Sequence, residues 1–351
     1  MTHPYADAPG YRRWRQAMAA PAASEVDPVV TFPFQMTKTD KVVAAGSCFA
    51  QHISRHLREQ GFNFLVTEPA HPLLDAATAE AMHYGVYSAR YGNVYTSRQL
   101  LHLLRRAYGR FTPADDVWEQ NGRYTDPFRP AIQPNGFATR QEYDADRRQH
   151  FAAVRRAFEE MDILVFTLGL TECWYDSIDG AAYPMCPGTI AGRFDPARHA
   201  FVNLGVEDVV ADMTSFIAEL RALNPGVRVI LTVSPVPLAA TGEDRHVLTA
   251  TTYSKAVLRV AADILARLEG VAYFPSYEII MSPSSRGAYF DDDLRSVREQ
   301  GVAHVMRLFF KHAAGLTENA PAPTPQPAPT FLEEMRGVVD ALCEEQQLDR
   351  D

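Results

Sequence analysis

The stretch Lys41-Val42-Val43-Ala44-Ala45-Gly46-Ser47-Cys48-Phe49-Ala50 decides the fold that the sequence predicts. Its first half is a short apolar run that starts with β-branched residues, which is typical of a buried strand. Apolar residues then follow at helical spacing, at Phe49, Ile53 and Leu57, until Gly61. The sequence therefore predicts a strand that leads directly into a helix, with Ser47 at the junction.

The same strand pattern recurs three more times along the chain. Apolar runs lie at 162–169, 228–235 and 271–275, and helical patterns precede them over about 141–160, 206–223 and 250–268. Near-continuous apolar strands separated by helices indicate a parallel sheet that is covered on both faces, which is an α/β layer architecture. In such folds the reactive groups gather at the carboxyl ends of the strands.

The pattern of prolines and apolar runs divides the chain into four parts. These are an irregular N-terminal extension over 1–40 with one short helix near 11–20; a domain over 41–315 with a long irregular insertion at about 111–137; a proline-rich linker over 316–330; and an acidic helix over 331–351. Long loops are usually functional, so the insertion is a candidate lid. We expect the last helix to dock on the domain or to bind a protein partner.

Composition excludes several classes of protein. The net charge of −9 does not favour a broad phosphate-binding surface, so nucleic acid is not expected as a partner. Four cysteines without a CxxC pair predict neither disulfides nor a metal site. Without an apolar stretch of signal-peptide or membrane-spanning length, we expect a cytoplasmic protein with no membrane insertion. Acyl-CoA is available as an acyl donor in that compartment.

Ser47 carries two interpretations that the residues alone leave open. Its hydroxyl lies near unpaired N–H groups and the positive end of a helix dipole, which favours a developing oxyanion or a phosphate. The same position is that of an ordinary N-cap. Cys48 is a third option as nucleophile, although one residue into the helix it is expected to be buried.

At GSCFA (46–50) the sequence resembles the GSCFA-domain family, which is related to the SGNH (GDSL-like) hydrolases and acyltransferases. Further blocks that resemble this family lie at 83–97, 126–134, 166–174, 231–241, 245–259 and 273–280, so the resemblance covers about 30–310. It implies a flavodoxin-like three-layer α/β/α sandwich with a parallel sheet.

The resemblance also implies roles for residues. Ser47 matches the nucleophile, and Gly169 with Thr171 follows its strand as a Gly-x-Asn block would, with threonine in place of asparagine. A hydroxyl is a weaker oxyanion donor than an amide. Gly92-Asn93 lies where another block is expected, so Asn93 is a candidate for the missing amide.

The general base departs from the pattern of the SGNH hydrolases. Where Asp-x-x-His is expected, the chain reads Asp292-x-x-Arg295, and arginine cannot accept a proton at neutral pH. The usual triad cannot be assembled from these positions. We predict that His246, in the loop after a strand, is the base, and its alternative is a structural or substrate-binding role. His83 is the second candidate.

Several carboxylate and cationic side chains are further candidates for the site. Glu172 and Glu278 are candidates to orient the histidine, and Glu172 also fits a helix-start or surface position. Lys255 is expected in a cationic pocket together with Arg129, Arg245, Arg259 and Arg295. Arg295 has two interpretations: a clamp for an anionic group near Ser47, or a partner of Asp291–Asp293 that holds its own loop.

Two functions follow. The first is an SGNH-like serine esterase or O-acyltransferase that acts through a Ser47 acyl-enzyme on an acyl ester, with acetyl favoured, of a glycan or glycan precursor, as in polysaccharide biosynthesis. It requires no cofactor, and acyl-CoA is the donor if the reaction is a transfer. The second is a catalytically silent domain that binds a carbohydrate or nucleotide. The substitution of the expected histidine by Arg295 supports this second function.

Overall fold

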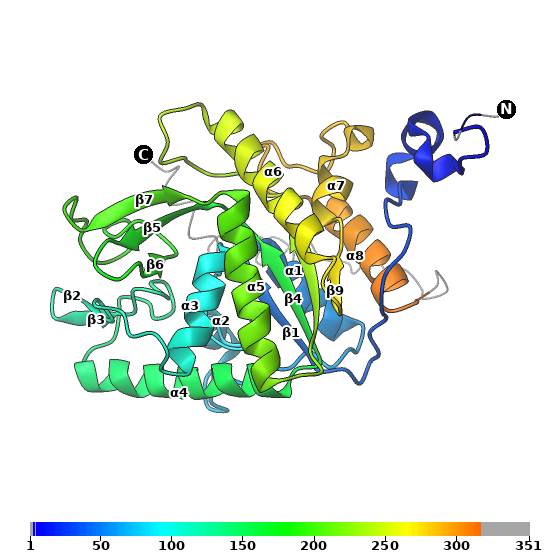
Figure 1. Ribbon diagram of the computed structural model, residues 1–351. Coiled ribbons are helices and arrows are strands. Elements are labelled where there is room, and N and C mark those ends of the chain that lie inside the picture. The colour runs from blue at the N-terminus through cyan, green and yellow to red at the C-terminus, as the bar shows by residue number, and fades with distance from the viewer. Residues whose placement is uncertain (1–2, 4, 317–351) are drawn as a thin grey trace.

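The computed structural model describes residue 3 and residues 5–316, and its centre is a parallel sheet (Figure 1). The sheet contains β1 (Val42–Gly46), β4 (Ile163–Leu168), β8 (Arg228–Val233) and β9 (Val271–Tyr273), in the order β1-β4-β8-β9. All its neighbouring strands run parallel, and Gly46 is opposite Thr167. An isolated parallel bridge joins Val42 to Phe64. The predicted α/β class with a parallel sheet is confirmed.

Helices cover both faces of this sheet. One face packs against α3 (Ser97–Ala107), α4 (Arg140–Glu160), α5 (Val206–Leu223) and α6 (Val247–Leu265); the other packs against α1 (Phe49–Glu59), α7 (Ser276–Met281) and α8 (Glu299–Ala313). A short α2 (Ala76–Ala81) precedes α3. Successive residues of β1 point to opposite faces, so Val43 belongs to the first core and Val42 to the second. This explains why β1 is apolar at every position.

Two smaller sheets were not predicted. An antiparallel sheet has the order β6-β5-β7, and a hairpin lies within the insertion; their strands are β5 (Glu172–Asp176), β6 (Ala182–Tyr183), β7 (His199–Asn203), β2 (Trp118–Gln120) and β3 (Arg123–Thr125). The 111–137 insertion is therefore not wholly irregular. Its turn is Asn121-Gly122, both with positive φ, and this dipeptide is the usual sequence signal for a tight hairpin.

The N-terminal extension lacks long helices, as predicted, but it packs against the domain. The expected helix near 11–20 is divided into η1 (Gly10–Arg12) and η2 (Arg15–Ala19); the other short turns are η3 (Ala23–Glu25) and η4 (Pro283–Ser285). His304 Nε2 lies 3.0 Å from the Val26 carbonyl, and Lys311 donates to Asp27 at 2.8 Å. Burial alone would raise the pKa of Asp27, but hydrogen bonds from Lys311 and His312 lower it.

Two structural predictions concern residues outside the described part. The linker, beyond Leu316, and the helix predicted over 331–351 lie outside the described residues. Within residues 5–316, no helix has the length and apolar character to cross a membrane.

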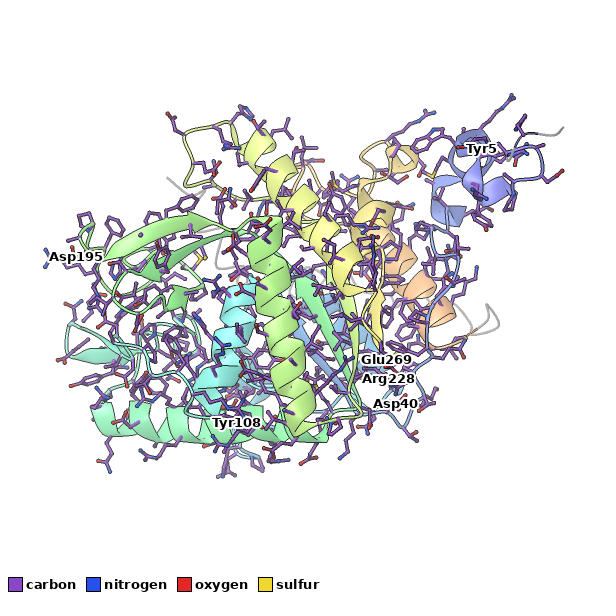
Figure 2. All side chains as sticks on the ribbon, in the orientation of Figure 1. Tyr5, Asp40, Tyr108, Asp195, Arg228 and Glu269 are labelled. Carbon is purple, nitrogen blue, oxygen red and sulfur yellow. The ribbon has the colours of Figure 1, made fainter. Side chains whose placement is uncertain are left out.

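An ion pair marks the end of the sheet at which the parallel strands begin. Asp40 precedes β1, Arg228 begins β8, and their side chains approach to 2.9 Å at the lower edge of the sheet in Figure 2. The carboxyl ends of the parallel strands therefore lie at the opposite, upper edge. Ser47 and the loops after β4, β8 and β9 meet there, as the sequence predicts.

Candidate functional site

Ser47 lies where β1 leaves the sheet. Gly46 has φ 144°, and a Cβ at this position would lie 2.5 Å from the Thr167 carbonyl oxygen. Only glycine allows this close approach of the two strands. Cys48, not Ser47, is the N-cap of α1, so the N-cap interpretation of Ser47 is not what the structure shows.

The Ser47 hydroxyl is buried without a hydrogen bond. The residue is 4% exposed, and Oγ has no partner among the residues that the structure describes. Leaving a buried hydroxyl unpaired costs about 1–3 kcal/mol, and such groups in native structures need an explanation. No described part of the fold therefore uses this hydroxyl as a hydrogen-bond partner.

Two chain segments enclose Ser47. Val94 N–H donates to the Gly46 carbonyl at 2.9 Å, and the Tyr87 hydroxyl lies 2.6 Å from Asn93 Oδ1 and 3.4 Å from the Ser47 carbonyl. On the other side, a Cβ at Gly169 would lie 2.9 Å from Ser47 Cβ. The structure thus brings together three residues that the sequence predicted for one site: Ser47, Asn93 and Gly169.

The loop after β4 has its donors engaged. Gly169 N–H and Leu170 N–H both donate to the Tyr95 carbonyl at 3.0 Å. Thr171 N–H donates to Ser254 Oγ at 3.1 Å, and the Thr171 hydroxyl donates to Asn203 Oδ1 at 2.6 Å. In this structure, therefore, neither Gly169 N–H nor the Thr171 hydroxyl has a hydrogen left for an oxyanion.

The loop after β1, unlike the loop after β4, has backbone donors without an acceptor among the described residues. The backbone N–H groups of Ser47 and Gly92 have no acceptor within residues 5–316. Gly92 has φ 67°, and no atom lies within 4 Å of the position that its Cβ would occupy. Backbone donors without a protein acceptor, close to a serine hydroxyl, are what an oxyanion site needs.

His246 lies at the N-cap of α6. It is exposed, and its Nδ1 accepts the N–H of Leu248 at 3.1 Å. Since Ser47 Oγ has no hydrogen-bond partner among the described residues, neither His246 nor His83 is within hydrogen-bond reach of it. His83 is buried, and burial, with a contribution from the charge of Arg90, lowers its pKa to about 4.

Glu172 holds the loop that carries His246. Its two carboxylate oxygens accept the Thr241 hydroxyl at 2.7 Å and Gly242 N–H at 3.0 Å. It begins β5 rather than standing in an open loop. The second candidate to orient the histidine, Glu278, instead accepts from Arg259 and from the Tyr273 hydroxyl, at 2.5 and 2.7 Å.

Lys255 is deeply buried beside this loop. It is 1% exposed, and its Nζ donates to the Gly169 carbonyl at 2.7 Å. The preceding residue, Ser254, accepts from Thr171. Two successive residues of α6 therefore hold the residues that pack against Ser47. Thr251-Thr252-Tyr253-Ser254 precede Lys255 and Ala256-Val257-Leu258 follow it, so the sequence around it is of mixed polarity and gives no signal of this burial.

Arg295 contacts the loop after β8. Its Nε donates to the Pro237 carbonyl at 3.2 Å, and its backbone N–H donates to Asp293 at 2.9 Å. Arg298 forms the ion pairs with Asp291 and Asp292, at 2.9 and 3.2 Å. The loop over 291–296 thus contains the ion pairs of Arg298 and a turn at Asp293, and the charge of Arg295 contributes to lowering the pKa of Asp293 against the effect of burial.

The predicted cationic pocket is not assembled as a unit. Arg129 is buried and pairs with Asp126 and Asp146, both at 2.8 Å. Arg259 pairs with Glu278, and Arg245 with Glu243. Each of these arginines has its own carboxylate, which is the physical reason that they do not gather around one ligand.

A buried charge network was missed by the sequence analysis. It consists of Glu68, Arg90, Arg106, Asp126, Arg129 and Asp146. Arg90 donates to Asp146 at 2.7 Å and to the Ile132 carbonyl at 3.0 Å, so it fastens the insertion to α4. The run Asp126-Pro127-Phe128-Arg129 was visible, but the depth of its charges was not.

Comparison with known proteins gives one match. The model of the GSCFA family matches residues 41–309, which is most of the chain. No curated protein and no solved structure matches it. Within the described residues, no group of three or more His, Cys, Asp or Glu side chains is arranged to hold a metal ion.

Proposed function

Since the chain belongs to the GSCFA family, we propose that it transfers or hydrolyses an acyl group through Ser47, as a serine esterase or O-acyltransferase. The observation that carries this proposal is the buried Ser47 hydroxyl without a hydrogen-bond partner among the described residues. The free N–H groups of Ser47 and Gly92 support it, because an acyl transition state places negative charge on an oxygen.

The order of the chain segments supports a relationship to the SGNH hydrolases. With the Phe64 bridge outside β1, the order is Phe64 segment, β1, β4, β8, β9. This is the 2-1-3-4-5 order of flavodoxin-like sheets, in which ligands bind at the carboxyl edge near the first strand. Ser47 lies at that place, which favours the flavodoxin-like three-layer arrangement.

The proposed reaction has two steps. Ser47 Oγ forms a bond to the acyl carbon, its proton passes to a base, and the bond from that carbon to the leaving oxygen or sulfur breaks. The leaving group takes up a proton. Water or an acceptor hydroxyl then attacks the acyl-enzyme and releases Ser47. The Ser47 and Gly92 N–H groups, with the Asn93 side chain, stabilise the oxyanion of each step.

Two side chains are candidates for the base. His246 requires a rearrangement at the start of α6, because its Nδ1 is engaged by Leu248. Lys255 is already buried beside Gly169, and lysines in such surroundings are known to act as general bases. We retain His246 as the predicted base and take Lys255 as its rival.

The substrate is proposed as a chemical class. We propose an acetyl ester of a glycan or glycan precursor, with acyl-CoA as the donor for transfer in the cytoplasm. Arg295, which contacts the loop after β8, is proposed to attract an anionic part of the substrate or donor through the positive charge of its guanidinium. We expect no cofactor.

The test is labelling with a serine-directed fluorophosphonate, followed by hydrolysis of a chromogenic acetyl ester. We expect the label on Ser47 by peptide mass spectrometry, and none in Ser47→Ala. His246→Ala and Lys255→Met then distinguish the two bases, because the loss of the base removes labelling in a folded protein. The matched control is His56→Ala, in α1. A folded protein that gives neither label nor turnover would falsify the proposal.

The second candidate function is a catalytically silent binding domain. Two observations favour it: neither His246 nor His83 reaches Ser47, and Arg295 stands where the SGNH pattern would have a histidine. Under this alternative, Ser47 binds a carbohydrate or nucleotide hydroxyl without forming a bond. The same experiment separates the two, because a binding domain leaves the probe unreacted.

A further inference from the structure

A second polar pocket lies beside the Ser47 site, between α3, β6 and the insertion. Its wall includes Asn93, Gln99, His102, Arg106, Phe128 and Ala182. Asn93 belongs to both places, since it also contacts Tyr87 next to Ser47. No residue of α3 was assigned to a site by the sequence, so the polar side chains that α3 presents to this pocket have no role in the proposed chemistry.

Arg106 is the unusual residue of this pocket. Its side chain is 5% exposed, and its guanidinium donates no hydrogen bond to any residue that the structure describes. Asp126 is 3.8 Å away, and the guanidinium lies 3.5 Å from the centre of the Phe128 ring. Burial lowers the pKa of Arg106 to about 10, so it remains charged at neutral pH.

Two side chains near Arg106, those of His102 and Gln99, have their acceptor atoms engaged in hydrogen bonds, so only their N–H donors remain. His102 Nδ1 accepts Ala182 N–H at 3.3 Å, and burial lowers the pKa of this histidine to about 3, so Nε2 carries the hydrogen. Gln99 Oε1 accepts Tyr95 N–H and Thr96 N–H at 2.8 and 2.9 Å. The amide NH₂ of Gln99 therefore remains as a donor.

These side chains offer mainly hydrogen-bond donors to a bound molecule. The acceptor atoms of Gln99 and His102 are engaged, so both residues can only donate to it. The carboxylates of the charge network are closer to other arginines: Asp126 approaches Arg129 to 2.8 Å, and Asp146 approaches Arg90 to 2.7 Å. Arg106 is left with the weakest compensation.

We propose that this pocket binds a small carboxylate, with Arg106 as its charged partner and His102 and Gln99 as further donors. A carboxylate offers two acceptor oxygens to an arginine fork, which a neutral amide of the same size does not. The site stands independently of the Ser47 chemistry, because no atom of Ser47 takes part in it.

The test follows the imidazole ¹⁵N resonances of His102 during titration with acetate. We expect a saturable shift in the wild type and none with acetamide, a comparison that needs no variant. Arg106→Gln should weaken acetate binding about tenfold or more, since a charge-assisted pair is lost. Arg105→Gln removes the neighbouring charge of α3, which pairs with Glu219 at the surface, and should leave binding unchanged.

Ser47→Ala separates this proposal from the proposed function. Acetate as a reaction product binds near Ser47, but only acetate in the pocket shifts His102, and that shift should persist in Ser47→Ala. The proposal is overturned if His102 does not respond to acetate in the wild type, if acetamide produces the same shift, or if a folded Arg106→Gln binds acetate as tightly as Arg105→Gln does.

Discussion

The loops after β1 and β4 reach the same edge of the sheet, yet they differ in how their polar groups are satisfied. After β4, Gly169, Leu170 and Thr171 all donate to protein acceptors. After β1, the Ser47 hydroxyl and N–H have no acceptor among the described residues. The β4 loop thus has its donors satisfied within the fold, whereas the β1 loop carries polar groups that the described fold leaves without a hydrogen bond.

The contact between the two loops gives the largest expected effect. In Gly169→Ala the new Cβ would lie 2.9 Å from Ser47 Cβ and 3.1 Å from the Tyr95 carbonyl. We expect Ser47 to be displaced, with about a hundredfold loss of probe labelling and a stability loss of about 1–3 kcal/mol. Labelling rates and urea unfolding measure the two effects.

The control for this substitution is Gly226→Ala. Nothing lies within 4 Å of the position of its added Cβ, and it is far along the chain from the site. We expect wild-type labelling and stability. If Gly169→Ala labelled as fast as Gly226→Ala, the β4 loop would not be the support of Ser47.

The pH dependence of the free energy of unfolding tests whether His83, the second candidate base for Ser47, is buried in solution. Burial lowers the pKa of His83 to about 4, against 6.5 for an unperturbed histidine. The unfolded chain binds this proton first as the pH falls, so the stability contribution is present above pH 6.5 and is lost between pH 6.5 and 4. The loss is roughly 3 kcal/mol at most. Urea unfolding at several pH values in this range gives the free energy of unfolding at each pH. This free energy should fall less steeply with decreasing pH in His83→Gln than in the wild type. An unchanged slope would show that His83 is solvated.

The strands were the most predictable part of the fold. β1 and α5 have the predicted bounds, because continuous apolar runs and helical spacing report burial directly. The helix predicted over 250–268 instead covers Val247–Leu265, since His246 supplies the N-cap that the apolar pattern does not show. The β5–β7 sheet was missed because its strands are only partly buried and lack a regular alternation.

The site was predictable only in part. Ser47, Asn93 and Gly169 follow strand ends or their neighbours, and topology brings such positions together. The hydrogen bonds of Thr171 and Glu172 depend on Asn203 and on Thr241, which are distant in sequence, so no local pattern reveals them. Likewise, nothing in the spacing of arginines shows that Arg129 approaches Asp126 to 2.8 Å while Arg106 stays 3.8 Å from it.

Thr171→Val sharpens the comparison on the β4 side. The substitution keeps the shape but removes the hydroxyl that donates to Asn203 Oδ1 at 2.6 Å. We expect a stability loss of about 1 kcal/mol, because the partly buried acceptor Asn203 Oδ1 loses its donor. Probe labelling of Ser47 should be unchanged, since this hydroxyl is not free to stabilise an oxyanion. A large loss of labelling with wild-type stability would instead assign it to the chemistry.

Glu172→Gln is expected to give the smallest effect. The carboxylate accepts the Thr241 hydroxyl and Gly242 N–H, and glutamine retains only one acceptor oxygen for these two donors. Because the group is partly solvated, we expect a loss of about 1 kcal/mol or less. Since Glu172 makes no hydrogen bond to His246 in the described structure, the rate of Ser47 labelling should stay within about twofold of the wild type. Measured at several pH values, labelling in Glu172→Gln should follow the wild-type profile. A shifted profile at unchanged stability would mean that Glu172 tunes a histidine after the loop over 241–246 rearranges, and that the support side of the site also takes part in proton transfer.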